Sequence, residues 1–155
     1  MKPDRMAIHI HSAAKHTGIE TNWSKSNLEM QKIIYIAHMF HLGKEKQPLV
    51  RGHFQAWDYG PVHPDLYHKA KIFGADPVKD IFNTDNDLDR KSPEAKTLNN
   101  VLDLVSDLSG STLVAITHCD YGAWYKNYIP GAKGIMIPNS DIREEYEERV
   151  KRAKQ

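Results

Sequence analysis

The sequence predicts a mostly α-helical fold, a single compact domain of five to six helices with at most a short β-hairpin or edge strands. Apolar residues recur at spacings of three and four in two segments, 27–42 and 93–108, which is the spacing of a buried helix face. A serine that can cap a helix precedes each segment. The chain has 155 residues, of which 40% are hydrophobic, enough to fold around one core. We therefore expect one domain over residues 1–155.

The first expected helix covers roughly residues 6–16. The second begins after Ser26, because Ser26 and Glu29 have the spacing of a capping box, in which each side chain accepts from the other residue's backbone N–H. Gly43 is expected to end this helix, since glycine readily adopts the left-handed conformation common at that position. The wide apolar stripe makes this the central helix; its members are Met30, Ile33, Ile34, Ile36, Ala37 and Phe40.

Residues 48–57 alternate weakly in polarity and include proline and glycine, so we expect an extended segment or a short hairpin there. Pro64 suits the first position of a helix reaching Phe73, with His63 or a neighbour as the cap and Gly74 as the stop. The segment 76–91 is rich in Asp and Asn without helical spacing, which indicates a surface loop.

Ser92 and Pro93 begin the next expected helix, whose apolar seam reaches Leu108 before Gly110. Ser111 is expected to cap a short helix over 112–118, although the β-branched residues there also suit a strand. Residues 130–138 form an expected loop, broken by a possible short edge strand over 135–137.

The last expected helix is capped by Ser140 and runs from Asp141 onward. Its acidic residues come early and its basic residues late, the order that the helix dipole favours. Only Ile142, Tyr146 and Val150 are apolar, so this helix is expected to pack through a narrow stripe.

Composition argues against several classes of protein. Lys and Arg total 21 against 20 Asp and Glu, a formal net charge of +1, which disfavours nucleic acid as a partner. The longest uncharged apolar stretch, 33–42, is much shorter than the roughly 20 residues of a membrane span. No signal-peptide core is recognised, and one cysteine rules out an internal disulfide framework. We expect a cytoplasmic protein.

Histidine and cysteine provide the candidates for metal or acid–base chemistry. His38 and His41 are three residues apart on the central helix, and His9 and His11 form a second close pair, but neither pair has a carboxylate or thiol at ligand spacing. His118 and Cys119 combine a base and a thiol, yet adjacent helical residues point about 100° apart. We expect no catalytic residue, metal or cofactor. A small metal- or thiol-dependent enzyme using His38, His41, His118 or Cys119 remains an alternative, and a DNA-binding regulator a weaker one.

Aromatic side chains concentrate in the turn-rich segment 56–67. It combines a tryptophan and two tyrosines with two prolines and a glycine, which restrict the backbone and suit a rigid binding platform. A second cluster follows at 118–125. Both could instead fasten their loops to the core. The candidate partner-binding residues are Trp57, Tyr59, Pro61, His63, Tyr67, His118 and Trp124, with Tyr125 beside them.

Three motifs resemble those of a known family. The stretch LEMQKIIYIAH at 28–38 resembles the "LQKLLYLAH" helix of the Panacea, or SocA-like antitoxin, family, which includes phage-associated GepA-type proteins. AWDYGPVHP at 56–64 resembles its "A-W-x-Y-G-P-V-x-P" signature, and Leu113, Thr117-His118 and Trp124 follow in order. The resemblance extends over about 28–142. Ala123 stands where the family often has proline.

The resemblance implies a small helical antitoxin of a toxin–antitoxin system. Such a protein would bind and neutralise a cognate toxin through protein–protein contact, without catalysis. A second route, in which the antitoxin hands its toxin to a protease, is also open.

Overall fold

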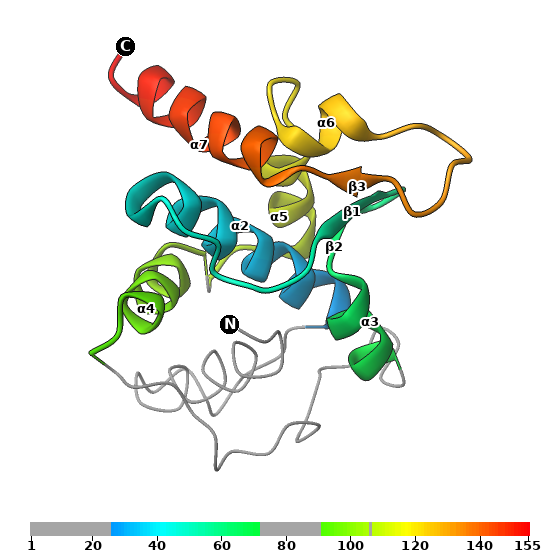
Figure 1. Ribbon diagram of the computed structural model, residues 1–155, viewed down its shortest axis with the longest axis horizontal. Coiled ribbons are helices and arrows are strands. Elements are labelled where there is room, and N and C mark those ends of the chain that lie inside the picture. Colours follow the sequence, from blue (N-terminus) through cyan, green and yellow to red (C-terminus); the bar gives the residue numbers. More distant parts are fainter. Residues whose placement is uncertain (1–25, 72–90, 106) are drawn as a thin grey trace.

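The computed structural model describes residues 26–71, 91–105 and 107–155, and Figure 1 shows their arrangement. These residues form six helices and one three-stranded antiparallel sheet. The helices are α2 (Asn27–Glu45), α3 (Pro64–Ala70), α4 (Pro93–Val105), α5 (Gly110–Thr117), α6 (Ala123–Asn127) and α7 (Asn139–Ala153). The mostly α fold class is therefore confirmed. The helix expected over 6–16, the residues His9, His11, Phe73 and Gly74, and nearly all of the loop expected over 76–91 lie outside the described residues.

Helix α2 is the centre of the fold, with α4, α5 and α7 packed around it (Figure 1). Ile33, Ile34 and Tyr35 are each 0% exposed, so the expected central position is confirmed. The predicted capping box is also present: the Glu29 backbone N–H donates to Ser26 Oγ at 3.3 Å, and the Ser26 N–H donates to Glu29 Oε1 at 3.4 Å.

The end of α2 differs from the prediction. The helix continues past Gly43 to Glu45, and Lys46 takes the left-handed conformation with φ of +60°. Gly43 is needed for packing instead, because a Cβ at this position would overlap the Tyr146 ring of α7. The glycine thus marks a close approach of two helices.

The predicted starts of α5 and α7 are each wrong by two residues. Ser109 caps α5 in place of Ser111, accepting from the Thr112 backbone N–H at 3.2 Å. Helix α7 begins at Asn139 directly after Pro138, with no side-chain cap from Ser140. For α5 two neighbouring serines compete as caps, whereas α7 begins without a side-chain cap, so no capping signal marks its first residue.

Two further helices also correct the sequence-based expectations. Helix α4 begins at Pro93 as expected, with Ser92 Oγ accepting from the Ala95 N–H at 3.2 Å. It ends at Val105, so Leu108 packs on the core from the following connection. Helix α6 was not predicted at all.

The sheet has the order β2–β1–β3 and consists of β1 (Phe54–Trp57), β2 (Gly60–Val62) and β3 (Met136–Ile137). Strands β1 and β2 form a hairpin, in which Trp57 pairs with Gly60 across the turn 58–59. The extended prediction for 48–57 is confirmed from Phe54 onward, and the edge strand near 135–137 is present. Phe54 and Ala56 point into the core, while Gln55 and Trp57 lie on the other face.

Helix α3 follows the hairpin directly, because Pro64 opens it and His63 is its N-cap residue. The His63 side chain makes no cap hydrogen bond. In the described ranges, no helix is both long and apolar enough to cross a membrane.

Candidate partner-binding surface

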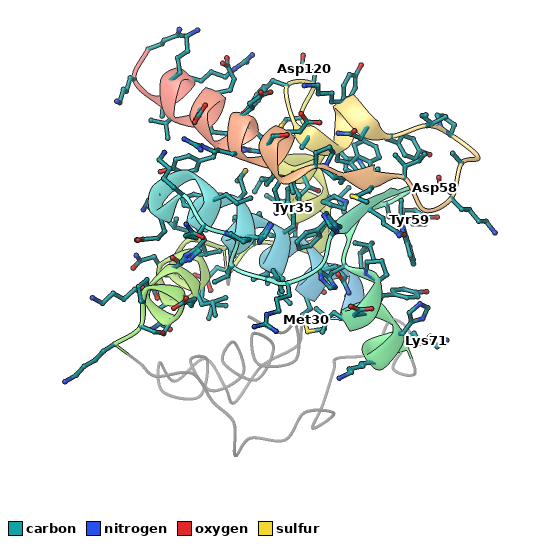
Figure 2. All side chains as sticks on the ribbon, in the orientation of Figure 1. Met30, Tyr35, Asp58, Tyr59, Lys71 and Asp120 are labelled. Atoms are coloured by element: carbon teal, nitrogen blue, oxygen red, sulfur yellow. The ribbon has the colours of Figure 1, made fainter. Side chains whose placement is uncertain are left out.

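A groove of about 710 Å³ lies along the outward face of the β1–β2 hairpin. It is bounded by the first turns of α2, by β1 and the hairpin turn, by α3 and by the loop 132–134. In Figure 2, Asp58 and Tyr59 mark the hairpin turn, and Lys71 marks the end of α3. We call this feature the hairpin groove; its lining residues are Asn27, Leu28, Gln31, Gln55, Trp57, Asp58, Tyr59, Val62, Tyr67, Lys71, Ala132, Lys133 and Gly134.

Three of the predicted aromatic residues line the hairpin groove. Trp57 and Tyr67 meet edge to face, with ring centroids 4.7 Å apart, and both are half-buried. The Trp57 indole N–H donates to Gln55 Oε1 at 2.9 Å, which fixes the ring on the face of the sheet. Tyr59 at the turn is 72% exposed. The groove therefore presents two oriented rings and one free ring to solvent.

The second aromatic cluster supports the hairpin turn from beneath. The Trp124 indole N–H donates to the Trp57 carbonyl at 2.7 Å, and Trp124 is only 7% exposed. The Trp124 ring is stacked on two neighbouring rings. Its centroid lies 3.8 Å from that of His118 and 4.5 Å from that of Tyr128. The Tyr128 hydroxyl in turn donates to Asp58 Oδ1 at 2.6 Å. This cluster, which we call the aromatic stack, holds the first half of the turn, at Trp57 and Asp58.

Lys32 is a buried cationic residue beneath the same hairpin. Its side chain is 0% exposed, and its ammonium Nζ donates to the Pro61 carbonyl at 3.2 Å. Gly60 has φ of +113°, and a Cβ there would lie 3.0 Å from His118 Nε2 and 3.2 Å from Lys32 Nζ. Lys32, Gly60 and His118 therefore meet at one point under β2.

Burial determines the proton affinities at this point. It lowers the pKa of Lys32 from 10.5 to about 7, because a charged amine loses hydration inside the protein. Burial also lowers the pKa of His118, and the nearby positive charge of Lys32 adds to that effect, while the Tyr59 backbone opposes it. His118 Nε2 is buried and has no hydrogen-bond partner among the residues that the structure describes. No local sequence signal marks Lys32, because it lies within an apolar helix and bonds to a residue 29 positions away.

The other predicted binding residues lie behind the hairpin groove. Pro61 and His63 are buried, His63 being 1% exposed. The His63 backbone N–H donates to Gln31 Oε1 at 2.9 Å, and His63 Nε2 lies 2.8 Å from the Arg51 carbonyl. Trp124 and His118 belong to the aromatic stack, and Tyr125 is 58% exposed on α6, away from the groove.

The histidine pair on α2 does not converge. The His38 ring bonds to Asn139 Oδ1 at 3.0 Å and accepts from the backbone N–H groups at 49 and 50, both at 3.2 Å. His41 bonds to Thr97 Oγ1 at 2.8 Å. Burial lowers the pKa of His38 to about 4 and also lowers the pKa of His41. Within the three described ranges, no group of three or more His, Cys, Asp or Glu side chains is placed to hold a metal ion.

Cys119 belongs to a second buried polar network, not to a base–nucleophile pair. The Arg149 guanidinium lies 3.3 Å from its sulfur, and burial raises the pKa of the thiol despite that positive charge. Arg149 also pairs with Glu145 Oε2 at 3.0 Å. Glu145 is 1% exposed and accepts at Oε1 from the Tyr35 hydroxyl at 2.8 Å and the Ala123 N–H at 2.9 Å.

This network joins α2, α6 and α7, and it changes the expected packing of α7. The predicted stripe is confirmed for Ile142, which is 0% exposed, whereas Val150 is only half-buried. Glu145 also lies on the buried face of α7. In the sequence, only its i,i+4 spacing from Arg149 indicates that the two side chains form an ion pair.

Comparison with known proteins supports the resemblance seen in the motifs. The structure defines the class as a small helical domain whose hairpin carries an exposed aromatic groove. The sequence profile described as "Antitoxin SocA-like, Panacea domain" matches residues 30–125. The chain belongs to this family. That range contains most of α2, the whole hairpin, α3, and two members of the aromatic stack, His118 and Trp124.

One curated relative is the protein named Antitoxin SocA of Caulobacter vibrioides (strain NA1000 / CB15N). It is 35% identical over 111 residues, which cover 64% of this chain and 57% of the relative. The match thus spans less than two thirds of that protein's length. No solved structure matches the chain.

Proposed function

We propose that this protein is an antitoxin that binds a cognate protein toxin directly and neutralises it without catalysis of its own. The observation that carries the proposal is the family match over 30–125, the range that contains the three aromatic residues of the hairpin groove, Trp57, Tyr59 and Tyr67. Under this proposal the toxin docks on Trp57, Tyr59 and Tyr67. Pro61, His63, His118 and Trp124 hold those residues in place.

The geometry favours an interface at this surface. Aromatic side chains on rigid backbone give protein interfaces much of their binding free energy. Here the carbonyls of Trp57 and Pro61 are bonded to buried side chains from α6 and α2, so the turn loses little conformational freedom on binding.

The buried histidines and the thiol already have structural partners, which supports a binding role over an enzymatic one. His38 and His41 bond to neighbouring elements, and burial lowers the pKa of each. Burial also raises the pKa of Cys119, which reduces the thiolate fraction needed for nucleophilic attack.

The proposal is tested with the product of the gene beside this one. Co-expression should relieve its toxicity, and the purified proteins should form a complex. Tyr59→Ala should weaken binding about tenfold, or about 1.4 kcal/mol, with an unchanged thermal midpoint because Tyr59 is 72% exposed. Tyr125→Ala is the matched control, being an exposed tyrosine outside the groove.

Two outcomes would contradict the proposal. One is a neighbouring gene product that is neither toxic nor bound; the other is unchanged affinity in a folded Tyr59→Ala variant. Inhibition of the purified toxin without any protease separates direct blocking from delivery to a protease.

A further inference from the structure

We propose that the hairpin groove accepts an acidic segment of the partner protein, in which an apolar or aromatic anchor is flanked by carboxylate side chains. The inference rests on the proposed function insofar as the partner is taken to be the toxin. The groove chemistry itself can be tested without a toxin.

The charged groups of the groove are mostly positive. Lys71 and Lys133 are exposed, and neither forms an ion pair with any described residue. Asp58 is the acidic residue of the lining, and its Oδ1 already accepts the Tyr128 hydroxyl at 2.6 Å. The groove lining thus holds two cations that lack an ion-pair partner among the described residues, and one carboxylate that is partly engaged.

The amide side chains of the lining add donors to these cations. Gln55 Oε1 accepts from the Trp57 indole, and Asn27 Oδ1 accepts from Gln31 Nε2 at 3.2 Å. Gln31 Oε1 accepts from the His63 N–H. The amide oxygens are thus occupied, whereas the NH₂ groups of Gln55 and Asn27 have no partner in the described part of the chain. A donor-rich groove fits a ligand rich in acceptors, and carboxylates are the strongest acceptors in proteins.

The floor of the groove supplies the apolar part of the recognition. Trp57 and Tyr67 form an edge-to-face pair, Val62 lies beside them, and Leu28 is 40% exposed at the rim. An apolar side chain placed here would cover aromatic surface, and flanking carboxylates would meet Lys71 or Lys133. A basic segment would instead bring like charges together, which is unfavourable.

The test uses three capped pentapeptides of defined sequence: Glu-Glu-Trp-Glu-Glu, Gln-Gln-Trp-Gln-Gln and Lys-Lys-Trp-Lys-Lys. Each is titrated into the ¹⁵N-labelled full chain, and binding is followed by amide and indole chemical shifts. We expect the acidic peptide to bind most tightly, to shift the Trp57 indole signal, and to weaken between about 50 mM and about 500 mM NaCl as charges are screened.

Variants of the two lysines provide the second readout. The double variant Lys71→Gln, Lys133→Gln should weaken the acidic peptide about tenfold and leave the neutral peptide unchanged. The control is Lys151→Gln, Lys154→Gln, which removes two exposed charges from the C-terminal end of the chain, outside the groove. Both double variants should keep the wild-type thermal midpoint, because all four side chains are exposed.

Several results would overturn the inference. They are absence of binding by the acidic peptide, equal or tighter binding by the basic peptide, shifts that miss the groove, and insensitivity to the lysine changes. Self-association that Tyr59→Ala abolishes would assign the groove to a second copy of this chain. Charge selectivity combined with no neutralisation of the neighbouring gene product would refute the antitoxin proposal and leave the groove chemistry standing.

Discussion

Replacing Lys32 by Met should stabilise the protein at neutral and acidic pH. The lysine is 0% exposed, and its ammonium donates to a backbone carbonyl, that of Pro61. Its folded pKa is about 7, against 10.5 for the ordinary amine. Below pH 7 both the folded and the unfolded state are protonated, so the native state carries the full free-energy cost of a buried charge. Methionine has a similar shape and no charge.

The size of the effect follows from the pKa difference. A displacement from 10.5 to about 7 corresponds to at most about 5 kcal/mol of destabilisation by the charged form. Removing the ammonium leaves the Pro61 carbonyl without its donor, which costs about 1–3 kcal/mol. We therefore expect Lys32→Met to raise the free energy of unfolding by about 2–4 kcal/mol at pH 6.

The pH dependence provides the sharper test. As pH rises from 7 to 10.5, the unfolded state still binds the proton and the folded state does not, so the stability of the wild type increases by up to about 1.4 kcal/mol per pH unit. The variant lacks this gain, and its advantage should shrink and then reverse. Urea unfolding followed by circular dichroism at pH 6 to 10 measures the difference, with Lys151→Met as an exposed control. A difference that does not change with pH would refute the reasoning.

The remaining predictions concern the core and its buried polar groups. Ile33→Ala, at a site that is 0% exposed, should cost about 2–5 kcal/mol in urea unfolding; a loss below about 1 kcal/mol would contradict full burial. Glu145→Gln should cost about 3–5 kcal/mol by leaving Arg149 without its buried partner, whereas Glu148→Gln, in an exposed pair, should change stability by less than about 1 kcal/mol. The folded pKa of His38, about 4, lies below its ordinary value, so wild-type stability should fall by about 3 kcal/mol between pH 6.5 and pH 4. His38→Gln should lessen that fall.

Local sequence signals were enough to predict the helices that carry them. The capping box at Ser26 and Glu29 and the apolar stripe gave the start and the burial of α2, because both depend on residues a few positions apart. Gly43 was misread because the same residue type serves two purposes. It permits a left-handed helix end, and it also permits close packing, here against Tyr146. Sequence alone does not distinguish these uses.

Such local signals do not predict elements that are short or weakly capped. Helix α6 has five residues and begins at Gly122 without a side-chain cap, so neither periodicity nor capping marks it. Its stability comes from tertiary bonds, among them the Ala123 N–H to Glu145, 22 residues away. Such a bond depends on how α7 returns across the fold, which no local pattern encodes.

The candidate site was predictable only in part, because some of its features are local in the sequence and others depend on the tertiary fold. The concentration of aromatic residues in 56–67 identified the segment that lines the groove, because rings and prolines are visible in the sequence. The separation between exposed rings, such as Tyr59, and buried supports, such as Trp124, was not visible, since it depends on which face of the hairpin each ring occupies.

The support beneath the hairpin explains why a buried lysine could be retained despite its cost. Lys32 bonds to the carbonyl of Pro61 on β2, while Trp124 bonds to that of Trp57 on β1. The Lys32 amine thus holds β2 and the Trp124 indole holds β1, on the two sides of the turn that presents Tyr59. A methionine at position 32 would remove one of these two bonds while stabilising the fold as a whole. If the turn must be rigid to bind its partner, Lys32→Met should therefore separate two properties that usually change together, by increasing the free energy of unfolding while weakening the attachment of the hairpin.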